Sequence, residues 1–291
     1  MPEIVPVPLV IHLPPNAQLP RMREILDDLC GLLERALLPA ARFKPEPGKP
    51  ENDVRLACVM HAFNALDAGR AIYTLSGTDY AGTVAPHFRT IFEALVKIRW
   101  MRKHPPRARS FLQSEPFERY ALATARVKKS TRWPTIVDDC KKAVEKHPVL
   151  LNLPNVTKGP NKRPDFRAIA MALRMPDLAE MAKSLGMDAE DYLIDHAVPS
   201  LTPHTSVVHV KSYAKRMNPD GTITMSTEMD PTMLLGYVAR SATRLGEVLN
   251  QVLELYPDGK VLYDSEKVAE TLVDVTTMLR NSTLGQASAT D

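Results

Sequence analysis

Apolar side chains recur at helical spacing along most of the chain. The clearest stripe lies over 230–256, where apolar residues return every three or four positions and Asp230-Pro231 supplies a cap and a first-turn proline. Similar stripes predict helices over the ranges 21–38, 53–75 and from 79 or 83 to 104. Shorter patterns predict further helices over 106–129 (interrupted near Ser114), 134–147, 165–174, 176–185, 188–197, 203–213 and around 268–279. The predicted fold class is therefore all-α, an irregular helical bundle.

One segment departs from this periodicity. The turn sequence Asn-Pro-Asp-Gly at 218–221 precedes the alternating run Thr-Ile-Thr-Met at 222–225. This pattern predicts one small β-hairpin at about 217–229.

Proline is abundant and glycine is scarce. The 291 residues include 25 prolines and 12 glycines, against usual shares of about 5% and 7%. This argues against a glycine-turn-rich barrel and against a nucleotide fold built on glycine-rich loops. Ten of the prolines lie in the first 50 residues, and many others fit helix starts or stops. We therefore divide the chain into a proline-rich strap with one helix (1–50), a main helical domain (51–282) and a frayed tail (283–291).

The net charge of +3 conceals an uneven distribution of charge. The range 97–174 holds 19 Lys and Arg against 6 Asp and Glu, a balance of +13, and the remaining residues have a balance of −10. Such a basic insert can contact phosphates of RNA. The alternatives are that it docks on the acidic remainder of the chain, docks on another subunit, or is only solvated.

The N-terminal sequence and the cysteines bear on the compartment. The apolar run over 5–13 is broken by Pro6, Pro8 and His12 and lacks a basic start, so it does not fit a signal peptide. No apolar window approaches the length of a membrane span. With three scattered cysteines and no export signal, we expect a cytoplasmic protein without a membrane partner.

Standard catalytic and metal motifs are absent from the sequence. It contains no GxxxxGK[ST], GxGxxG, GxSxG or HExxH pattern and no CxxC pair. His204 and His209 are five residues apart, which places them on different faces of a helix or strand. We therefore expect no metal and no cofactor.

Two arginine–histidine spacings suggest a first family resemblance. Arg55 precedes His61 and Arg99 precedes His104 at a separation that resembles the active-site signature of the HEPN ribonuclease superfamily. The resemblance implies a histidine that transfers protons and an arginine that stabilises phosphate charge while the RNA 2′-hydroxyl cleaves the chain.

A second resemblance is broader and rests on two short motifs. Arg89-x-x-x-Glu93 on a predicted helix, followed later by Ser206-x-x-His209, is similar to an uncharacterised bacterial helical family classed as a domain of unknown function. The resemblance covers about residues 53–255. It implies a helical fold and supplies no activity.

The pair Arg89 and Glu93 has a physical consequence of its own. Residues four apart share a helix face and can form an ion pair, and apolar neighbours such as Phe88 and Phe92 suggest that this face meets the bundle interior. A buried pair needs further polar partners. Candidates for these partners are His61, Asn64, Asp67, Ser206 and His209. The pair forms either a polar network that fixes helix register or a pocket where Glu93 or His209 acts as acid or base while Arg89 binds an anion.

These observations lead to three functional hypotheses. The first is a HEPN-like protein that acts on or binds RNA or another phosphate-bearing ligand. Its predicted catalytic residues are His209, Glu93 and His61, and its predicted binding residues are Arg89, Arg55, Ser206 and His204. The second is a non-catalytic protein- or ligand-binding module that forms a homo-oligomer through the helix over 230–256. A metal-dependent hydrolase ranks last.

Overall fold

The chain is described by a computed structural model. Described residues are 15–41, 49–78, 81–126, 135–145, 176–197, 199, 214–217, 223–225, 229 and 231–256. The predicted helices over 165–174, 203–213 and 268–279 and the predicted tail over 283–291 lie outside these residues.

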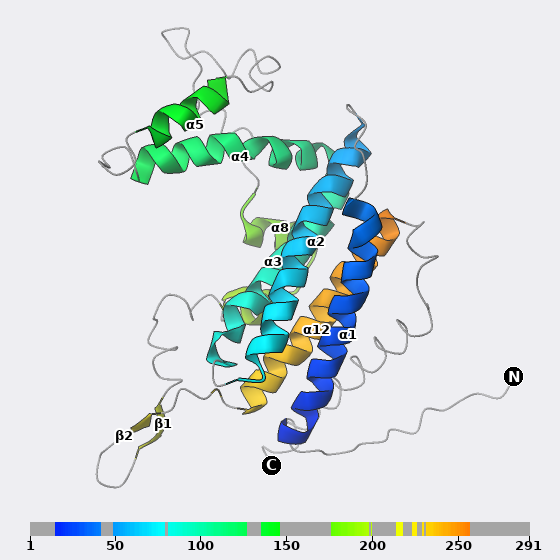
Figure 1. Cartoon of the computed structure of the whole chain (residues 1–291), viewed down its shortest axis with the longest axis vertical. Helices are drawn as coiled ribbons and strands as arrows, with labels where there is room; N and C mark the ends of the chain where they lie inside the picture. Colours follow the sequence, from blue (N-terminus) through cyan, green and yellow to red (C-terminus); the bar gives the residue numbers. More distant parts are fainter. Residues whose placement is uncertain are drawn as a thin grey trace, which may run out of the picture. The chain divides into compact units, whose positions relative to one another are not determined.

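The described residues are mostly helical, as the apolar periodicity predicts (Figure 1). The helices are α1 (Pro15–Ala41), α2 (Pro50–Leu75), η1 (Ala81–Thr83), α3 (Val84–Lys103), α4 (Pro105–Arg126), α5 (Ile136–Glu145), α8 (Leu178–Ser184), α9 (Ala189–Tyr192), η2 (Leu193–Ala197) and α12 (Pro231–Leu255). The element η1 is a short 3₁₀ turn, and η2 is a π-helical turn.

Two compact units divide the chain. The first draws on the ranges 1–44, 58–99 and 182–291, and the second on 45–57 and 100–181. Most of the predicted basic insert over 97–174 falls in the range of the second unit.

Four helices form the bundle of the first unit. Arg23 on α1 donates to the Tyr73 carbonyl of α2 at 3.0 Å and to Oγ of Ser76, which directly follows α2, at 3.1 Å. Phe88 on α3 packs against Tyr237 on α12, with ring centroids 5.7 Å apart. Helices α1 and α12 also contact each other extensively. The bundle is therefore closed by contacts of α1 with α2 and α12, and of α3 with α12.

Gly69 marks the closest approach between three of these helices. A Cβ atom at this position of α2 would lie 2.9 Å from Cys30 Sγ on α1 and 3.2 Å from Leu245 Cδ2 on α12. Real Cβ atoms essentially never lie within 3.0 Å of another heavy atom, and 3.2 Å is tighter than nine in ten of their contacts. Glycine at this position therefore lets the three helices pack together, which offsets its low helix propensity.

The apolar stripes of α1 and α12 supply much of the core. Eleven residues of α12 are buried within the chain, among them Val238, Leu245 and Leu249. This is the stripe that the sequence suggested as an oligomer surface, and it is already covered by the chain's own helices. The apolar face of α1 is equally buried, including Leu26, Leu29 and Leu33. Helix α1 is therefore a full member of the bundle, whereas the proline clusters predict a strap lying on its outside.

In the second unit, α4 packs against α5. Proline lies inside α4 at Pro116, so the helix continues through the interruption that the sequence predicts near Ser114. The Ser114 hydroxyl donates to the Phe111 carbonyl at 2.9 Å. Near the start of α4, Arg109 forms a 2.7 Å ion pair with Asp53.

Two short strands lie in the region of the predicted hairpin. Strands β1 (Ala214–Met217) and β2 (Ile223–Met225) pair antiparallel, with Met217 opposite Ile223 and an irregularity between Ala214 and Arg216. The residues between the two strands, and most of those over 226–230, lie outside the described residues.

Candidate functional site

Glu93 is the centre of a cluster of cations in the first unit. Arg89 Nε donates to Glu93 Oε1 at 2.7 Å, which confirms the ion pair that the i,i+4 spacing predicts. His196 Nε2 lies 3.3 Å from the same oxygen, and Lys97 Nζ lies 3.6 Å from Oε2. We call these four side chains, Arg89, Glu93, Lys97 and His196, the Glu93 cluster.

The cations determine the ionisation of Glu93. Hydrogen bonding from His196, then from Arg89, with the charge of Lys97, lowers the Glu93 pKa from 4.5 to about 2, although burial opposes the shift. A carboxylate with so low a pKa stays ionised at neutral pH and has little tendency to accept a proton. Glu93 is therefore suited to orienting its partners and poorly suited to being the acid or base that the sequence suggested.

His196 reaches the cluster from the π-helical turn η2. Its side chain is 16% exposed, and its ring lies 4.9 Å from the Tyr192 ring and 6.4 Å from the Phe92 ring, measured between centroids. The imidazole is therefore held by aromatic rings at the same time as it contacts a carboxylate. This combination fixes the ring orientation, which is a requirement for directed proton transfer.

His61 lies close enough to the cluster to respond to its charges. Burial and then the nearby charge of Lys97 lower its pKa from 6.5 to about 4, and the charge of Glu93 acts in the opposite direction. The side chain is 6% exposed. His61 is therefore a neutral imidazole at physiological pH.

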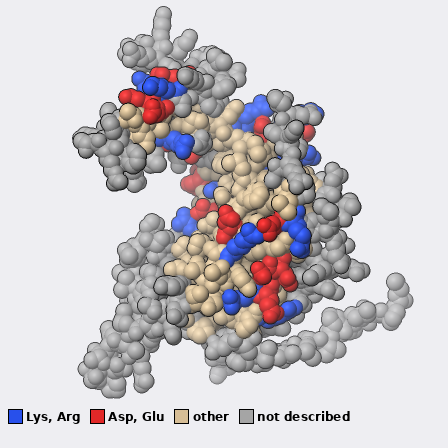
Figure 2. Space-filling view, viewed as in Figure 1, with Lys and Arg blue, Asp and Glu red and all other residues tan. Residues whose placement is uncertain are grey.

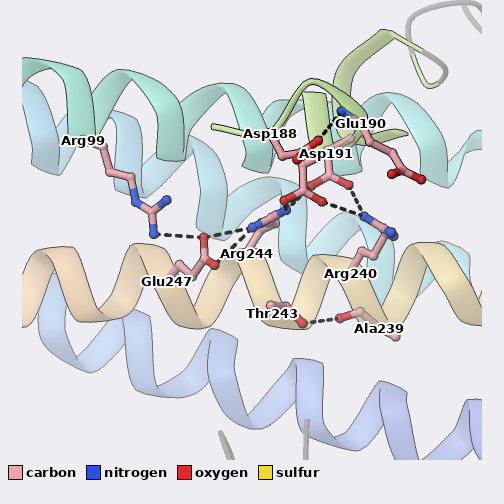
Figure 3. A network of polar contacts seen from close by, with 10 residues as sticks. Arg99, Asp188, Glu190, Asp191, Ala239, Arg240, Thr243, Arg244 and Glu247 are labelled. Carbon is pink, nitrogen blue, oxygen red and sulfur yellow. Dashed lines mark hydrogen bonds and ion pairs between the residues drawn. The ribbon is translucent and has the colours of Figure 1, made fainter. Parts of the chain in front are cut away.

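A second charged network joins Asp191 of α9 to Arg240 and Arg244 of α12 and, through Glu247, to Arg99 of α3 (Figure 3). Asp195, which is fully buried, accepts hydrogen bonds from Arg240 Nη1 and Arg244 Nε, each at 2.7 Å. Arg244 also pairs with Glu247 at 3.1 Å, and Glu247 pairs with Arg99 of α3 at 3.4 Å. Asp191 adds longer contacts of 3.5 Å to Arg244 and 4.0 Å to Arg240. Three arginines thus face three carboxylates, so the network is balanced in charge.

Local sequence signals explain the conformation of the segment that leads into Asp195 and His196. Gly186 has a φ of 71°, and the amides of Gly186 and Met187 donate to the carbonyls of Lys183 and Ala182, which ends α8 in a Schellman motif. Asp188 then caps α9 by accepting a 2.6 Å hydrogen bond from the Glu190 amide. The periodicity correctly predicts helical structure within 176–185 and 188–197, but it does not predict the π-helical turn.

The structure brings together some of the predicted site residues. Arg89, Glu93 and His61 belong to the same region of the first unit, whereas Arg55 lies on the part of α2 in the second unit. The remaining predicted residues, Ser206, His204 and His209, lie outside the described residues.

The second predicted arginine–histidine pair, Arg99 and His104, has contacts with other residues. Arg99 pairs with Glu247, and the His104 ring packs on Trp100 with centroids 4.8 Å apart.

Sequence reasoning missed several residues of the two clusters. Lys97 is four residues after Glu93, so the same spacing rule that identifies Arg89 also identifies Lys97. Arg240 and Arg244 are likewise four apart, as are Asp191 and Asp195, and these spacings were a usable signal of charged helix faces. His196 carries no such signal, because its partner Glu93 is distant in sequence.

Several cations of the basic insert are paired with carboxylates. Lys97 contacts Glu93, Arg109 contacts Asp53, and on α5 Lys141 lies 3.8 Å from Glu145 and Lys142 lies 3.9 Å from Asp139. Figure 2 shows the described cationic and acidic side chains intermixed on the face in view. On that face they form no continuous patch of one sign among the residues described.

In the described residues, no three His, Cys, Asp or Glu side chains gather in a way that could hold a metal ion. None of the described helices has a stretch apolar and long enough to cross a bilayer.

The fold and the charged clusters define a helical-bundle protein with a carboxylate held among cations. The chain belongs to the Family of unknown function (DUF5677), whose model matches residues 55–222. This match agrees with the resemblance to an uncharacterised helical family and carries no description of an activity. No curated protein and no solved structure matches the chain.

Proposed function

We propose that the protein is a HEPN-like RNA-directed protein that binds an RNA phosphate at the Glu93 cluster and uses His196 for proton transfer. The observation that carries the proposal is the sharing of one ionised carboxylate, Glu93, by Arg89, Lys97 and His196. In this proposal His196 takes the proton-transfer role predicted for the buried His61, and the role of His209, which lies outside the described residues, stays a prediction.

The charge of the cluster favours an anionic ligand. Arg89 and Lys97 carry two positive charges and Glu93 carries one negative charge, so one positive charge is left over even when His196 is neutral. The side chains of Arg89 and Lys97 are 31% and 32% exposed, so a ligand can reach them from solvent. Guanidinium and ammonium groups bind phosphate oxygens by charge-assisted hydrogen bonds.

The position of His196 suits transphosphorylation by the RNA 2′-hydroxyl. A carboxylate that holds one ring nitrogen fixes the tautomer and prepares the imidazole for proton transfer. In the proposed step, His196 takes the proton from the 2′-hydroxyl, the 2′-oxygen forms a bond to phosphorus, and the bond from phosphorus to the 5′-oxygen breaks. The proton then passes to the leaving 5′-oxygen, and a 2′,3′-cyclic phosphate remains. Arg89 stabilises the charge that develops on the phosphate.

The basic insert supports RNA as the phosphate-bearing ligand. Its formal excess of 13 positive charges, of which Lys97, Arg99 and Arg109 are paired with carboxylates outside the insert, attracts a polyanion over the distance of a Debye length, about 8–10 Å at physiological salt. A small phosphate ester would gain little from such an extended excess of charge.

The proposal is tested with a mixed-sequence single-stranded RNA, with and without a chelator. We expect cleavage that resists the chelator and yields 2′,3′-cyclic phosphate ends, and a loss of about 100-fold or more in His196→Ala. Arg89→Ala should weaken both binding and cleavage. The control is Arg21→Ala, which removes an exposed arginine of α1 that forms a 3.2 Å ion pair with the neighbouring Glu24. Wild-type protein that neither binds nor cleaves RNA, or cleavage that is unchanged in His196→Ala, overturns the proposal.

A non-catalytic binding module is the second candidate. It is favoured by two large apolar side chains on α2, Met60 and Phe63, which are 49% and 37% exposed and three residues apart on one helix face. Exposed apolar residues grouped in this way are typical of contact surfaces. Light scattering that shows a stable dimer in wild type and a monomer in Met60→Ser, in a protein without RNA cleavage, would support this function instead.

A further inference from the structure

We propose that Asp195 and the two arginines that bind it, Arg240 and Arg244, are positioning residues that hold His196 against Glu93. This inference rests on the proposed function of His196. It assigns a role to three residues that lie on different elements from Glu93 and that the sequence did not single out.

The contacts around Asp195 are short and fully enclosed. Arg240 Nη1 lies 2.7 Å from Oδ1, and Arg244 Nη2 lies 2.6 Å from Oδ2, while the Asp195 side chain has no exposed surface. Each carboxylate oxygen is thus held by a different arginine. Two arginines bound to the two oxygens fix the rotation of the carboxylate as well as its position.

The helical spacing of α12 produces this double contact. Arg240 and Arg244 are four residues apart and therefore lie on one helix face, about 6 Å from each other along the axis. Arg244 is 12% exposed and lies over the Phe92 ring, with its guanidinium carbon 5.9 Å from the ring centroid. Phe92 immediately precedes Glu93 on α3, so Arg244 contacts both Asp195 and the residue next to Glu93.

Because Asp195 and His196 are adjacent on η2, fixing the Asp195 carboxylate also fixes the position of the His196 ring. Neighbouring residues on a helical turn point in directions roughly 90–100° apart. Asp195 points to α12, so its neighbour His196 is directed to α3, where it meets Glu93 at 3.3 Å. A shift of the anchored carboxylate therefore moves the imidazole as well. The π-helical turn that carries both residues is a rare conformation that often occurs at functional sites.

Glu247 offers a matched comparison within the same network. It is a carboxylate that pairs with Arg244 and with Arg99, and it lies on α12 itself, whereas Asp195 lies on η2. Its removal breaks ion pairs of the network and leaves the anchor of η2 in place. Asp195→Asn and Glu247→Gln therefore separate positioning of His196 from general loss of charge pairing.

The experiment measures the ring ¹⁵N resonances of His196 in histidine-labelled full-length protein, identified by their loss in His196→Ala. We expect Asp195→Asn to move these resonances away from the wild-type pattern and Glu247→Gln to leave them unchanged. We also expect Asp195→Asn to lower the single-turnover cleavage of RNA by about 10- to 100-fold, with RNA affinity within about twofold of wild type. If Asp195→Asn does not fold, Arg240→Ala replaces it, because it removes the contact to Oδ1 that fixes the rotation of the carboxylate, while Arg244 still pairs with the buried charge.

The resonances test the positioning of His196, and the RNA assay tests the proposed activity, so either claim can be refuted without the other. Wild-type His196 resonances in a folded Asp195→Asn or Arg240→Ala variant overturn the positioning role, whatever the RNA result. Equal displacement in Glu247→Gln also overturns it, because the effect would then follow from loss of charge pairing alone. Displaced resonances in a protein that never cleaves RNA support the positioning of His196 and refute only the RNA activity.

Discussion

Replacing Glu93 by glutamine retains the shape of the side chain and removes its charge. In the wild type, this carboxylate accepts from Arg89 and His196 and lies 3.6 Å from Lys97. The amide can still accept a hydrogen bond, but it no longer neutralises the surrounding cations. The substitution therefore tests whether the Glu93 cluster stabilises the fold through charge.

The magnitude follows from the Glu93 pKa. A fall from 4.5 in the unfolded chain to about 2 in the folded protein corresponds to about 3 kcal/mol of stability at neutral pH, at roughly 1.4 kcal/mol per pKa unit. Because the folded pKa is depressed, this stability is present above pH 4.5 and is lost as the pH falls towards 2. We expect Glu93→Gln to cost about 2–3 kcal/mol at pH 7, since glutamine retains part of the hydrogen bonding.

The assay is urea unfolding followed by circular dichroism at 222 nm between pH 7 and the acid limit. For a protein of this size the expected loss corresponds to a melting temperature lower by roughly 5–10 °C. The matched control is Glu34→Gln, because Glu34 pairs with Arg70 at the surface, where the two side chains are 45% and 49% exposed. Such an exposed pair should contribute less than about 1 kcal/mol.

Two results would refute this reasoning. One is a Glu93→Gln variant whose free energy of unfolding at pH 7 equals that of the wild type or of the Glu34→Gln control. The other is a difference between wild type and variant that stays constant as the pH falls below 4.5.

Two further predictions concern the core of the bundle. His61→Leu should flatten the pH dependence of stability between pH 6.5 and 4. Because the His61 pKa is lowered in the folded protein, the unfolded wild type takes up a proton at a higher pH than the folded state, which costs up to about 3 kcal/mol of stability. A wild-type stability profile that is level over this range would contradict the lowered pKa. Gly69→Ala should lower the free energy of unfolding by about 1 kcal/mol, because the added Cβ meets Cys30 and Leu245. Gly236→Ala, whose Cβ meets nothing within 4 Å, should raise it by about 0.5–1 kcal/mol, and equal effects at the two glycines in thermal or urea unfolding would disprove the packing argument.

Prolines and their neighbours show how far local rules reach. Asp230-Pro231 predicts a helix start, and α12 begins at Pro231. Pro105-Pro106 predicts the end of the preceding helix, and α3 ends at Lys103. Pro116 shows the limit of these rules, because α4 continues through it although the sequence suggested an interruption. A proline costs one hydrogen bond, and packing of the helix against its neighbours can outweigh that cost.

The sequence by itself determined the helical class and the pairing of Arg89 with Glu93, because helix geometry places residues four apart on one face whatever surrounds them. It also contained the spacings of Lys97 and of the two α12 arginines. Only the tertiary structure decided that His196 meets Glu93 and that Asp195 meets α12. These contacts join residues about a hundred and about fifty positions apart, and no local spacing rule specifies which distant faces come together when the apolar stripes pack.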